Sequence, residues 1–350
     1  QGTDMNILKA VLKQEVFPAL GCTEPIALAY AAGLAARDVK GDLDTLDICV
    51  DPGVYKNGFA VTVPNTGGQK GNRIAATLGA LIKRPDLQMQ ILQQVTPDLI
   101  EQALGLIHQD RIHLNFDAKL TELSINVHLQ TTAGNSARVM IRGAHTHVVY
   151  HEINGHVKLD SRAQHHNEER GDDDGVYKTM LKKTKFPDFL QWVKEMDEQD
   201  RAFIQHGVDM NLKIAKAGKD LEKVGHYVSN LLEKGYLVDD VFTASKILTA
   251  SATDARMAGL NYPVMASGGS GNQGIVAILV PYTVGHYYKI PQPVILQSIG
   301  LSHLINSYIK CYTGDLSVLC GCAVAAGAGA AVAIVFQQYP DDVEKMTLAL

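Results

Sequence analysis

The spacing of apolar residues predicts strands and helices in the first half of the chain and mainly helices in the second. Residues 7–20 carry apolar side chains at 7, 8, 11, 12, 16 and 17, which is a helical rhythm. The same reasoning predicts helices at 25–37, 72–82, 97–108, 186–198, 220–234, 240–257, 292–310 and 316–336. Alternation predicts strands at 46–50, 59–63, 124–131, 137–142, 145–153 and 156–159. We therefore expect an α+β fold, with antiparallel strands mainly in the N-terminal half and a largely helical C-terminal half.

Short local signals place several expected ends and turns. Gly21 ends the first helix, and Thr23 is expected to cap the next one, whose first turn holds Pro25. Asn154-Gly155 predicts a hairpin turn between the last two strands.

A charged stretch marks the expected division of the chain. Residues 161–174 read SRAQHHNEERGDDD, a composition that favours a solvated loop. We expect a mobile charged loop at 160–175, preceded at 1–160 by an α+β part that starts with a helix-turn-helix and holds the antiparallel sheet. A mostly helical part at 176–350 should follow and pack with residues 7–37 into one core.

Composition narrows the class of protein. The chain has 350 residues, of which 46% are hydrophobic and 20% charged, as in globular proteins. Only 6% are aromatic and 31 are glycine, so small side chains must build much of the interior, including buried Ala/Gly-rich helices. The net charge of −5 gives no general attraction to nucleic acid or to an anionic membrane. The uncharged segment 316–336 lacks the flanking anchors of a membrane span and reads as buried core.

The cysteines and the N-terminus point to a reducing compartment. The five cysteines are Cys22, Cys49, Cys311, Cys320 and Cys322, an odd number, and residues 1–13 lack the apolar region of a signal peptide. We therefore expect a cytoplasmic protein with reduced thiols. Cys320-Gly321-Cys322 does not have the spacing of a structural zinc pair, and on a regular helix the two thiols would diverge.

Cys22 is the first candidate for chemistry. It stands in Gly21-Cys22-Thr23-Glu24-Pro25, immediately before an expected helix start. The unpaired N–H groups there lower the pKa of a thiol and favour the thiolate, which is a nucleophile and a soft-metal ligand. The alternative is that Cys22 is a small buried residue in a tight turn.

Two glycine-rich loops are further candidates. The loop 65–71 leads into a helix, and its free N–H groups suit a carboxylate or a phosphate, although the spacing is not that of a P-loop. The loop 267–274 has four glycines beside a strongly apolar segment, so a ligand that approaches its backbone is plausible. Each loop could instead be a plain packing turn.

Other polar residues give weaker signals. His145 and His147 would share one face of an expected strand and could hold a metal or a substrate, or simply face solvent. Lys310 has the chemistry of a pyridoxal phosphate lysine, but no phosphate loop accompanies it in a convincing frame.

An ordered series of segments resembles a known family. These segments are 21–25, 56–58, 63–67, 143–147, 254–257, 270–274 and 320–322. In this order they resemble the L-cysteine desulfidase family and its bacterial relatives, which are similar to the α-chain of iron–sulfur L-serine dehydratases. The resemblance runs from about residue 7 to the end of the chain.

The resemblance implies a lyase without pyridoxal phosphate that carries a 4Fe-4S cluster on three thiolates, with one iron open to the substrate. It implies Cys22 and Cys322 as ligands, with Cys320 as the substitute for Cys322. It further implies that Asn65, Thr66 and Gly67 hold the substrate carboxylate. Relatives continue with a further Gly/Cys segment, so the third ligand is expected beyond residue 350, with Cys49 and Cys311 as weak substitutes.

The resemblance implies the pocket lining, while the base and the partners are expected from chemistry and composition. Ser270, Gly271, Asn272 and Gln273 would line the pocket, and His145 and Lys310 are candidates for the base on chemical grounds alone. The expected partner is a small amino-acid substrate, with no nucleic acid and no membrane, and the chain could form a homo-oligomer. The activity could be L-cysteine desulfidation or L-serine dehydration, or the chain could be an amino-acid-binding module without a cluster.

Overall fold

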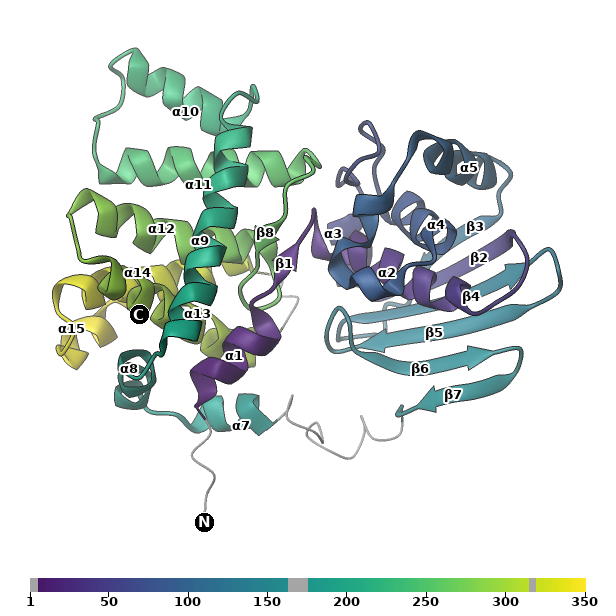
Figure 1. Ribbon diagram of the computed structural model, residues 1–350, viewed down its shortest axis with the longest axis horizontal. Coiled ribbons are helices and arrows are strands. Elements are labelled where there is room, and N and C mark those ends of the chain that lie inside the picture. Colours follow the sequence, from purple (N-terminus) through teal and green to yellow (C-terminus); the bar gives the residue numbers. More distant parts are fainter. Residues whose placement is uncertain (1–5, 163–175, 315–318) are drawn as a thin grey trace. The chain divides into compact units, whose positions relative to one another are not determined.

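The computed structural model describes residues 6–162, 176–314 and 319–350 and divides the chain into two compact units (Figure 1). Unit 1 comprises residues 1–18, 170–256 and 262–350, and unit 2 comprises residues 19–169 and 257–261. The first helix, α1 (Ile7–Glu15), belongs to unit 1, whereas α2 (Thr23–Arg37) belongs to unit 2. The short strand β1 (Pro18–Ala19) lies where the chain passes from one unit to the other.

Unit 2 is a six-stranded sheet covered by helices. Its elements after α2 are β2 (Leu43–Val50), α3 (Pro52–Gly58), α4 (Asn72–Ile82), the 3₁₀ segment η1 (Pro85–Gln94), α5 (Pro97–His108), β3 (Ile112–Phe116), β4 (Ser124–Thr131), β5 (Ser136–Arg142), β6 (Val148–Ile153) and β7 (His156–Asp160). The strand order is β3-β2-β4-β5-β6-β7, and β2 pairs with β3 in parallel, while the other neighbours are antiparallel. The α+β class is confirmed, with a mixed sheet.

Small residues bring α2 and α4 close together above this sheet. All six alanines of α2 are buried, and α2 packs on β4 and β5 as well as on α4. A Cβ atom placed on Gly79 would lie 2.0 Å from the carbonyl oxygen of Ala29, so the two helix backbones nearly touch. The buried side chains of β2, Leu46, Ile48 and Val50, alternate with half-buried or exposed ones, as expected for a sheet with one covered face.

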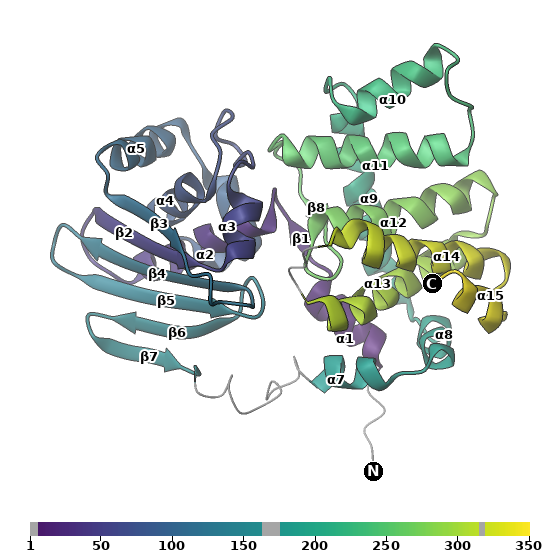
Figure 2. The ribbon, with the colours of Figure 1, turned by 180° about the vertical axis from the view of Figure 1, so that it is seen from behind.

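Unit 1 is largely helical. Its elements after α1 are α7 (Val176–Lys183), α8 (Phe186–Lys194), α9 (Glu198–Gly218), α10 (Val224–Glu233), α11 (Val241–Met257), β8 (Val264–Met265), α12 (Gly271–Tyr287), α13 (Gln292–Thr313), the π-helical turn η2 (Cys322–Ala326), α14 (Gly327–Gln338) and α15 (Val343–Leu348). The helix α13 is buried along most of its length and contacts α1, α7, α8, α9, α12 and α14. Figure 2 shows α13 and α14 side by side.

Several expected elements are confirmed at or near their bounds. The helices at 72–82 and 97–108 and the strand at 124–131 have the predicted ends. The hairpin at Asn154-Gly155 forms with positive φ at both residues (50° and 77°), as a tight turn between β6 and β7 requires.

Other expectations about the elements were wrong. The first helix ends at Glu15 rather than at residue 20, and Cys22 rather than Thr23 is the N-cap of α2. The segment 59–63 is not a strand. It directly follows α3, and its Thr62 makes an isolated bridge with Lys70. The helix expected at 186–198 is two helices, since Asp197 caps a new one by accepting from the backbone N–H of Asp200.

The last expected helix and the charged loop fall partly on residues that are not described. The loop at 160–175 lies mostly in 163–175, outside the described residues. The helix expected at 316–336 begins in 315–318, which are also outside the described residues, and the part that follows is η2 and then α14.

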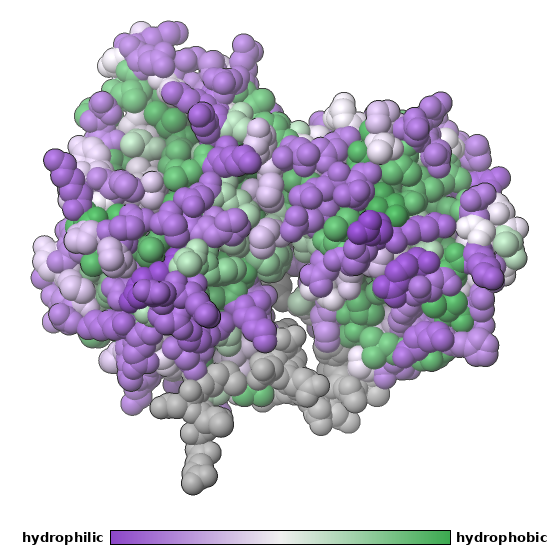
Figure 3. Space-filling model, in the orientation of Figure 1, coloured by the Kyte–Doolittle hydropathy of each residue, from purple (hydrophilic) through white to green (hydrophobic). Residues whose placement is uncertain are grey.

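Hydrophilic side chains cover much of the face seen in Figure 3. In the described parts of the chain, every helix is too short or too polar to cross a membrane.

Candidate functional site

The two C-terminal cysteines meet in unit 1. Cys320 is exposed and Cys322, at the start of η2, is half-buried. Burial raises the pKa of Cys322 to about 11, and the neighbouring Cys320 thiol, which is hydrogen bonded to it, adds to this effect, while the charge of Arg256 opposes it. The expectation that the two thiols diverge on a regular helix was wrong, because the chain is π-helical at Cys322 and Cys320 precedes the helix.

The glycine between these cysteines contacts the second glycine loop. A Cβ atom on Gly321 would lie 2.3 Å from Nε2 of Gln273, so the amide of Gln273 rests directly on the backbone of Gly321. Gln273 is buried, and its Oε1 has no hydrogen-bond partner among the described residues. Two segments that the sequence suggested separately, 267–274 and 320–322, are therefore in contact and form one candidate site.

Arg256 places a positive charge at this candidate site. It lies in the last turn of α11, buried, and its Nη1 donates to Oδ1 of Asn272 over 2.8 Å. A Cβ atom on Gly271 would lie 2.4 Å from Nε of Arg256, so only glycine leaves room for the guanidinium there. Arg256 belongs to the family segment 254–257, but the sequence assigns it no role. A single arginine within a helical pattern gives no sign of which residues it will contact.

The loop itself is held from α13. The backbones of Ser267 and Ser270 bond to each other in both directions (3.1 and 3.0 Å), with Gly268 and Gly269 at positive φ between them. The hydroxyl of Ser267 lies 2.8 Å from Nδ1 of His303 and accepts from Nδ2 of Asn306 over 2.9 Å. His303 is fully buried, and burial lowers its pKa to about 3, so the imidazole is neutral and acts as a fixed polar support.

Lys310 of α13 and Glu15 of α1 also bond to this turn. The ammonium of Lys310 donates to the carbonyl oxygen of Gly268, and the N–H of Gly269 donates to the carbonyl oxygen of Glu15 over 3.1 Å. The buried carboxylate of Glu15 accepts from the hydroxyls of Tyr177 (2.6 Å) and Ser307. Four residues from two helices, His303, Asn306 and Lys310 of α13 and Glu15 of α1, thus hold a turn whose glycines could not keep their conformation alone.

A second polar cluster forms in unit 2 around Glu24. Its carboxylate accepts from the Cys22 thiol (3.1 Å), the Thr23 hydroxyl (3.2 Å) and the Asn57 amide (3.2 Å). Burial alone would raise the pKa of Glu24, but the nearby charge of His145 and these hydrogen bonds together lower it, so the carboxylate is ionised. The sequence suggested Cys22 and His145 separately, and the structure brings them to one carboxylate.

His145 reaches this cluster from a turn and not from a strand. The strand β6 begins only at Val148, and residues 143–147 form a turn before it, so the expectation of a shared strand face with His147 was wrong. His145 is buried, whereas His147 is half-buried and its Nδ1 lies 3.0 Å from the carbonyl oxygen of Arg142. Neither Glu24 nor Asn57 was selected from the sequence, because each needs a fold to meet its partners.

The polar side chains at the start of the first glycine loop bond to backbone carbonyl groups of unit 2. The amide of Asn65 donates to the carbonyl oxygen of Leu92 (3.0 Å), and the buried hydroxyl of Thr66 donates to that of Val63 (2.6 Å). Gly67 has open space where a Cβ would stand, and its φ is 64°. The side chains of Asn65 and Thr66 are thus bonded to backbone groups of unit 2, while the backbone at Gly67 faces open space.

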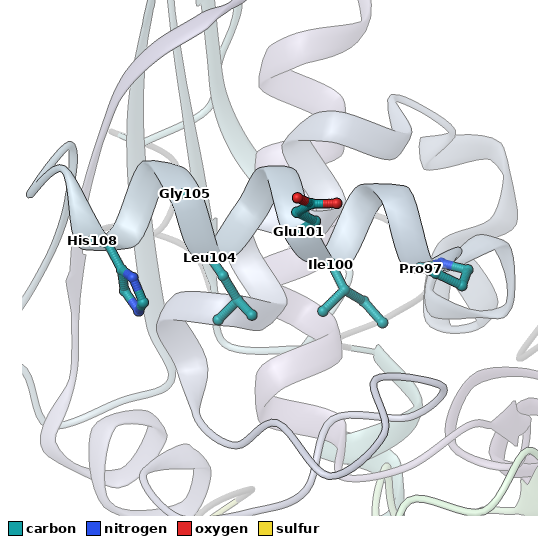
Figure 4. Close-up of a pocket in the computed structure, with 6 residues that line it drawn as sticks. All are labelled: Pro97, Ile100, Glu101, Leu104, Gly105 and His108. Carbon is teal, nitrogen blue, oxygen red and sulfur yellow. The ribbon is translucent and has the colours of Figure 1, made fainter.

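A surface cavity of unit 2 lies elsewhere. Figure 4 shows its lining along one helix, α5: Pro97, Ile100, Glu101, Leu104, Gly105 and His108. None of these residues was predicted to act, and the lining offers one carboxylate, Glu101, midway along the helix and one imidazole, His108, at its C-terminal end.

The thiols fit an iron–sulfur centre only in part. In the described ranges, no group of three or more His, Cys, Asp or Glu side chains could by itself hold a metal ion. The touching thiols of Cys320 and Cys322 are soft donors of the kind that such clusters take, but they make two ligands where a 4Fe-4S cluster needs three or four.

Comparison with known proteins identifies the family. The family model described as serine dehydratase alpha chain matches residues 86–345. The UPF0597 protein of Geobacter sulfurreducens is 53% identical over 346 residues, which are 99% of this chain and 80% of that protein. The UPF0597 proteins of Elusimicrobium minutum and Desulfotalea psychrophila are 42% and 36% identical, over 99% and 94% of this chain and 80% and 76% of theirs. No solved structure matches the chain.

The match confirms the relation to the α-chain of serine dehydratases that the ordered segments suggested. It covers the second glycine loop, Arg256 and the C-terminal cysteine pair, so the parts that form the site in unit 1 all lie inside the matched range. The chain belongs to the serine dehydratase alpha chain family.

Proposed function

We propose that the protein is a lyase that β-eliminates L-cysteine to pyruvate, ammonia and sulfide. The observation that carries the proposal is the meeting of Cys320 and Cys322 with Gln273 and Arg256 in unit 1. Soft thiols, a cation and an amide beside a glycine turn suit an amino acid whose β-substituent is to leave. Family membership supports a lyase of the serine dehydratase type.

The proposed cofactor is a 4Fe-4S cluster, with Cys22 and Cys322 as ligands and Cys320 as the substitute for Cys322. When bound, such a cluster would supply an open iron as a Lewis acid for the departing sulfur. The third thiolate is not assigned among the described residues.

The reaction balances with water as the only co-reactant. A base takes the α-proton, the C–S bond breaks and sulfide leaves, and the resulting enamine becomes an imine that water hydrolyses to pyruvate and ammonia. Of the two predicted bases, His145 lies near the ionised carboxylate of Glu24, which would stabilise the imidazolium that proton abstraction produces. The ammonium of Lys310 already donates to the carbonyl oxygen of Gly268, which suits an anchor of the turn better than a base.

L-serine is the alternative substrate. The description of the matching family as serine dehydratase alpha chain favours a hydroxyl as the leaving group. The elimination is otherwise the same, with water released in place of sulfide.

Pyruvate and sulfide release after anaerobic reconstitution with iron and sulfide test the proposal. We expect a brown protein that forms pyruvate and sulfide from L-cysteine, faster than pyruvate from L-serine. Cys322→Ser should lower both bound iron and pyruvate release, whereas Thr45→Ser, in β2, should lower neither. Faster turnover of L-serine would favour the alternative. A colourless, inactive protein that still binds amino acids would refute the lyase and leave a binding module.

A further inference from the structure

The start of α12 combines three groups that recognise the two charges of an amino acid. We propose that Arg256 and the first turn of α12 bind the α-carboxylate of the substrate, and that Oε1 of Gln273 accepts from its α-ammonium. This inference rests on the proposed function for the identity of the substrate, but it concerns binding and not elimination. It adds Arg256 to the site and assigns an atom to each charged group.

The carboxylate side of the site is built from a cation and a helix end. The helix α12 has 17 residues and begins at Gly271, and the side chain of its N-cap Ser270 makes no capping hydrogen bond. The amide groups of the first turn thus keep the positive end of the helix dipole. The guanidinium of Arg256 lies against this turn, fixed by its bond to Asn272 and by the absence of a side chain at Gly271.

The ammonium side of the site is a buried acceptor. Gln273 is 8% exposed, and its Oε1 has no hydrogen bond to any described residue. A buried acceptor of this kind is costly unless a ligand or water donates to it. An α-ammonium group carries three N–H donors and could donate one of them to this oxygen. The carboxylate and the ammonium of an amino acid are only a few ångströms apart, so groups within one helical turn can bind both.

The placement of the cysteines then orients the ligand. Gln273 rests on Gly321, and the charge of Arg256 acts on the thiol of Cys322, so both anchors border the cysteine pair. An amino acid held by its two charged groups would direct its β-substituent toward Cys320 and Cys322. The loop contributes rigidity, because His303, Asn306 and Lys310 hold the turn that precedes α12.

Ligand-observed NMR titration of the protein without iron tests the two anchors separately. The probes are L-serine, 3-hydroxypropionate, which lacks the ammonium group, and ethanolamine, which lacks the carboxylate. Arg256→Gln should weaken L-serine and 3-hydroxypropionate about tenfold or more and leave ethanolamine within about twofold. Gln273→Leu should weaken L-serine and ethanolamine and leave 3-hydroxypropionate unchanged.

Control variants separate these effects from damage to the fold. Arg84→Gln removes an exposed arginine of unit 2, and Gln199→Leu removes an exposed glutamine of α9, and both should leave all three affinities unchanged. If Arg256→Gln does not fold, Arg256→Lys keeps the charge and should weaken 3-hydroxypropionate by a smaller factor, because lysine cannot bind a carboxylate bidentately. Weakening of 3-hydroxypropionate by Asn65→Gly and not by Arg256→Gln would place the carboxylate at the other glycine loop and overturn the assignment.

Several outcomes would overturn the assignment. These are equal weakening of all three probes by either anchor variant, no weakening by either, or no binding of L-serine to the parent protein. If the crossed pattern appears but reconstituted protein forms no pyruvate, the head-group site stands and the lyase fails. If pyruvate forms and the anchor variants change no KM, the lyase stands and the head-group site fails.

Discussion

Gly321→Ala is expected to damage the site while leaving the fold intact. An alanine Cβ at this position would lie 2.3 Å from Nε2 of Gln273, whereas ordinary carbon contacts begin near 3.4 Å. The amide of Gln273 would therefore have to move by about 1 Å. A displacement of this size in a residue that positions the substrate lowers turnover by about 100-fold.

The stability of the same variant should hardly change. Gly321 has helical dihedral angles (φ −60°, ψ −25°), and alanine at such a position stabilises by about 0.4–1 kcal/mol through the unfolded state. The clash falls on the end of a flexible side chain, so this gain offsets part of its cost. We expect a free energy of unfolding within about 1 kcal/mol of the parent.

Gly274→Ala serves as the matched comparison one helical turn into α12. There a Cβ would lie 2.0 Å from the carbonyl oxygen of Met265, which is backbone and cannot rotate away. This variant should lose about 1–3 kcal/mol in urea unfolding. Coupled pyruvate release and urea unfolding measure both variants, and Gly321→Ala with turnover within about threefold of the parent would refute the placement of Gln273 at the site.

Three further predictions concern the framework of the two units. Glu15→Ala leaves two buried hydroxyls without their acceptor and should cost about 2–5 kcal/mol in urea unfolding, and a loss below 1 kcal/mol would contradict the network. Burial holds the pKa of His303 near 3, below its value in the unfolded chain, so the unfolded state binds the extra proton and stability should fall by about 1 kcal/mol per pH unit from pH 6.5 toward 3. His303→Gln should flatten that dependence, and an unchanged slope would count against it. Gly79→Ala should lower the melting temperature because of the clash with α2, whereas Gly105→Ala, which meets open space on α5, should raise it slightly.

The sequence alone determined the elements whose ends carry local chemical signals. Apolar spacing placed α5, whose start the structure shows to be capped by Thr96, and Asn154-Gly155 placed the hairpin, because these preferences act within a few residues. The ordered family segments were also sufficient to recognise the family. Glycine content likewise indicated close backbone approaches, which the contact of α2 with α4 confirmed.

Only the tertiary structure decided which of these segments meet. Periodicity reports which face of an element is apolar but not which element covers it, so Gln273 could not be matched with Gly321, nor Cys22 with Glu24 and His145. The π-helical turn at Cys322 is similarly invisible to a helical pattern, because its Ala/Gly composition fits an α-helix equally well. The chemistry of the site follows from these long-range contacts, since burial and neighbouring charge set the proton affinity of each group.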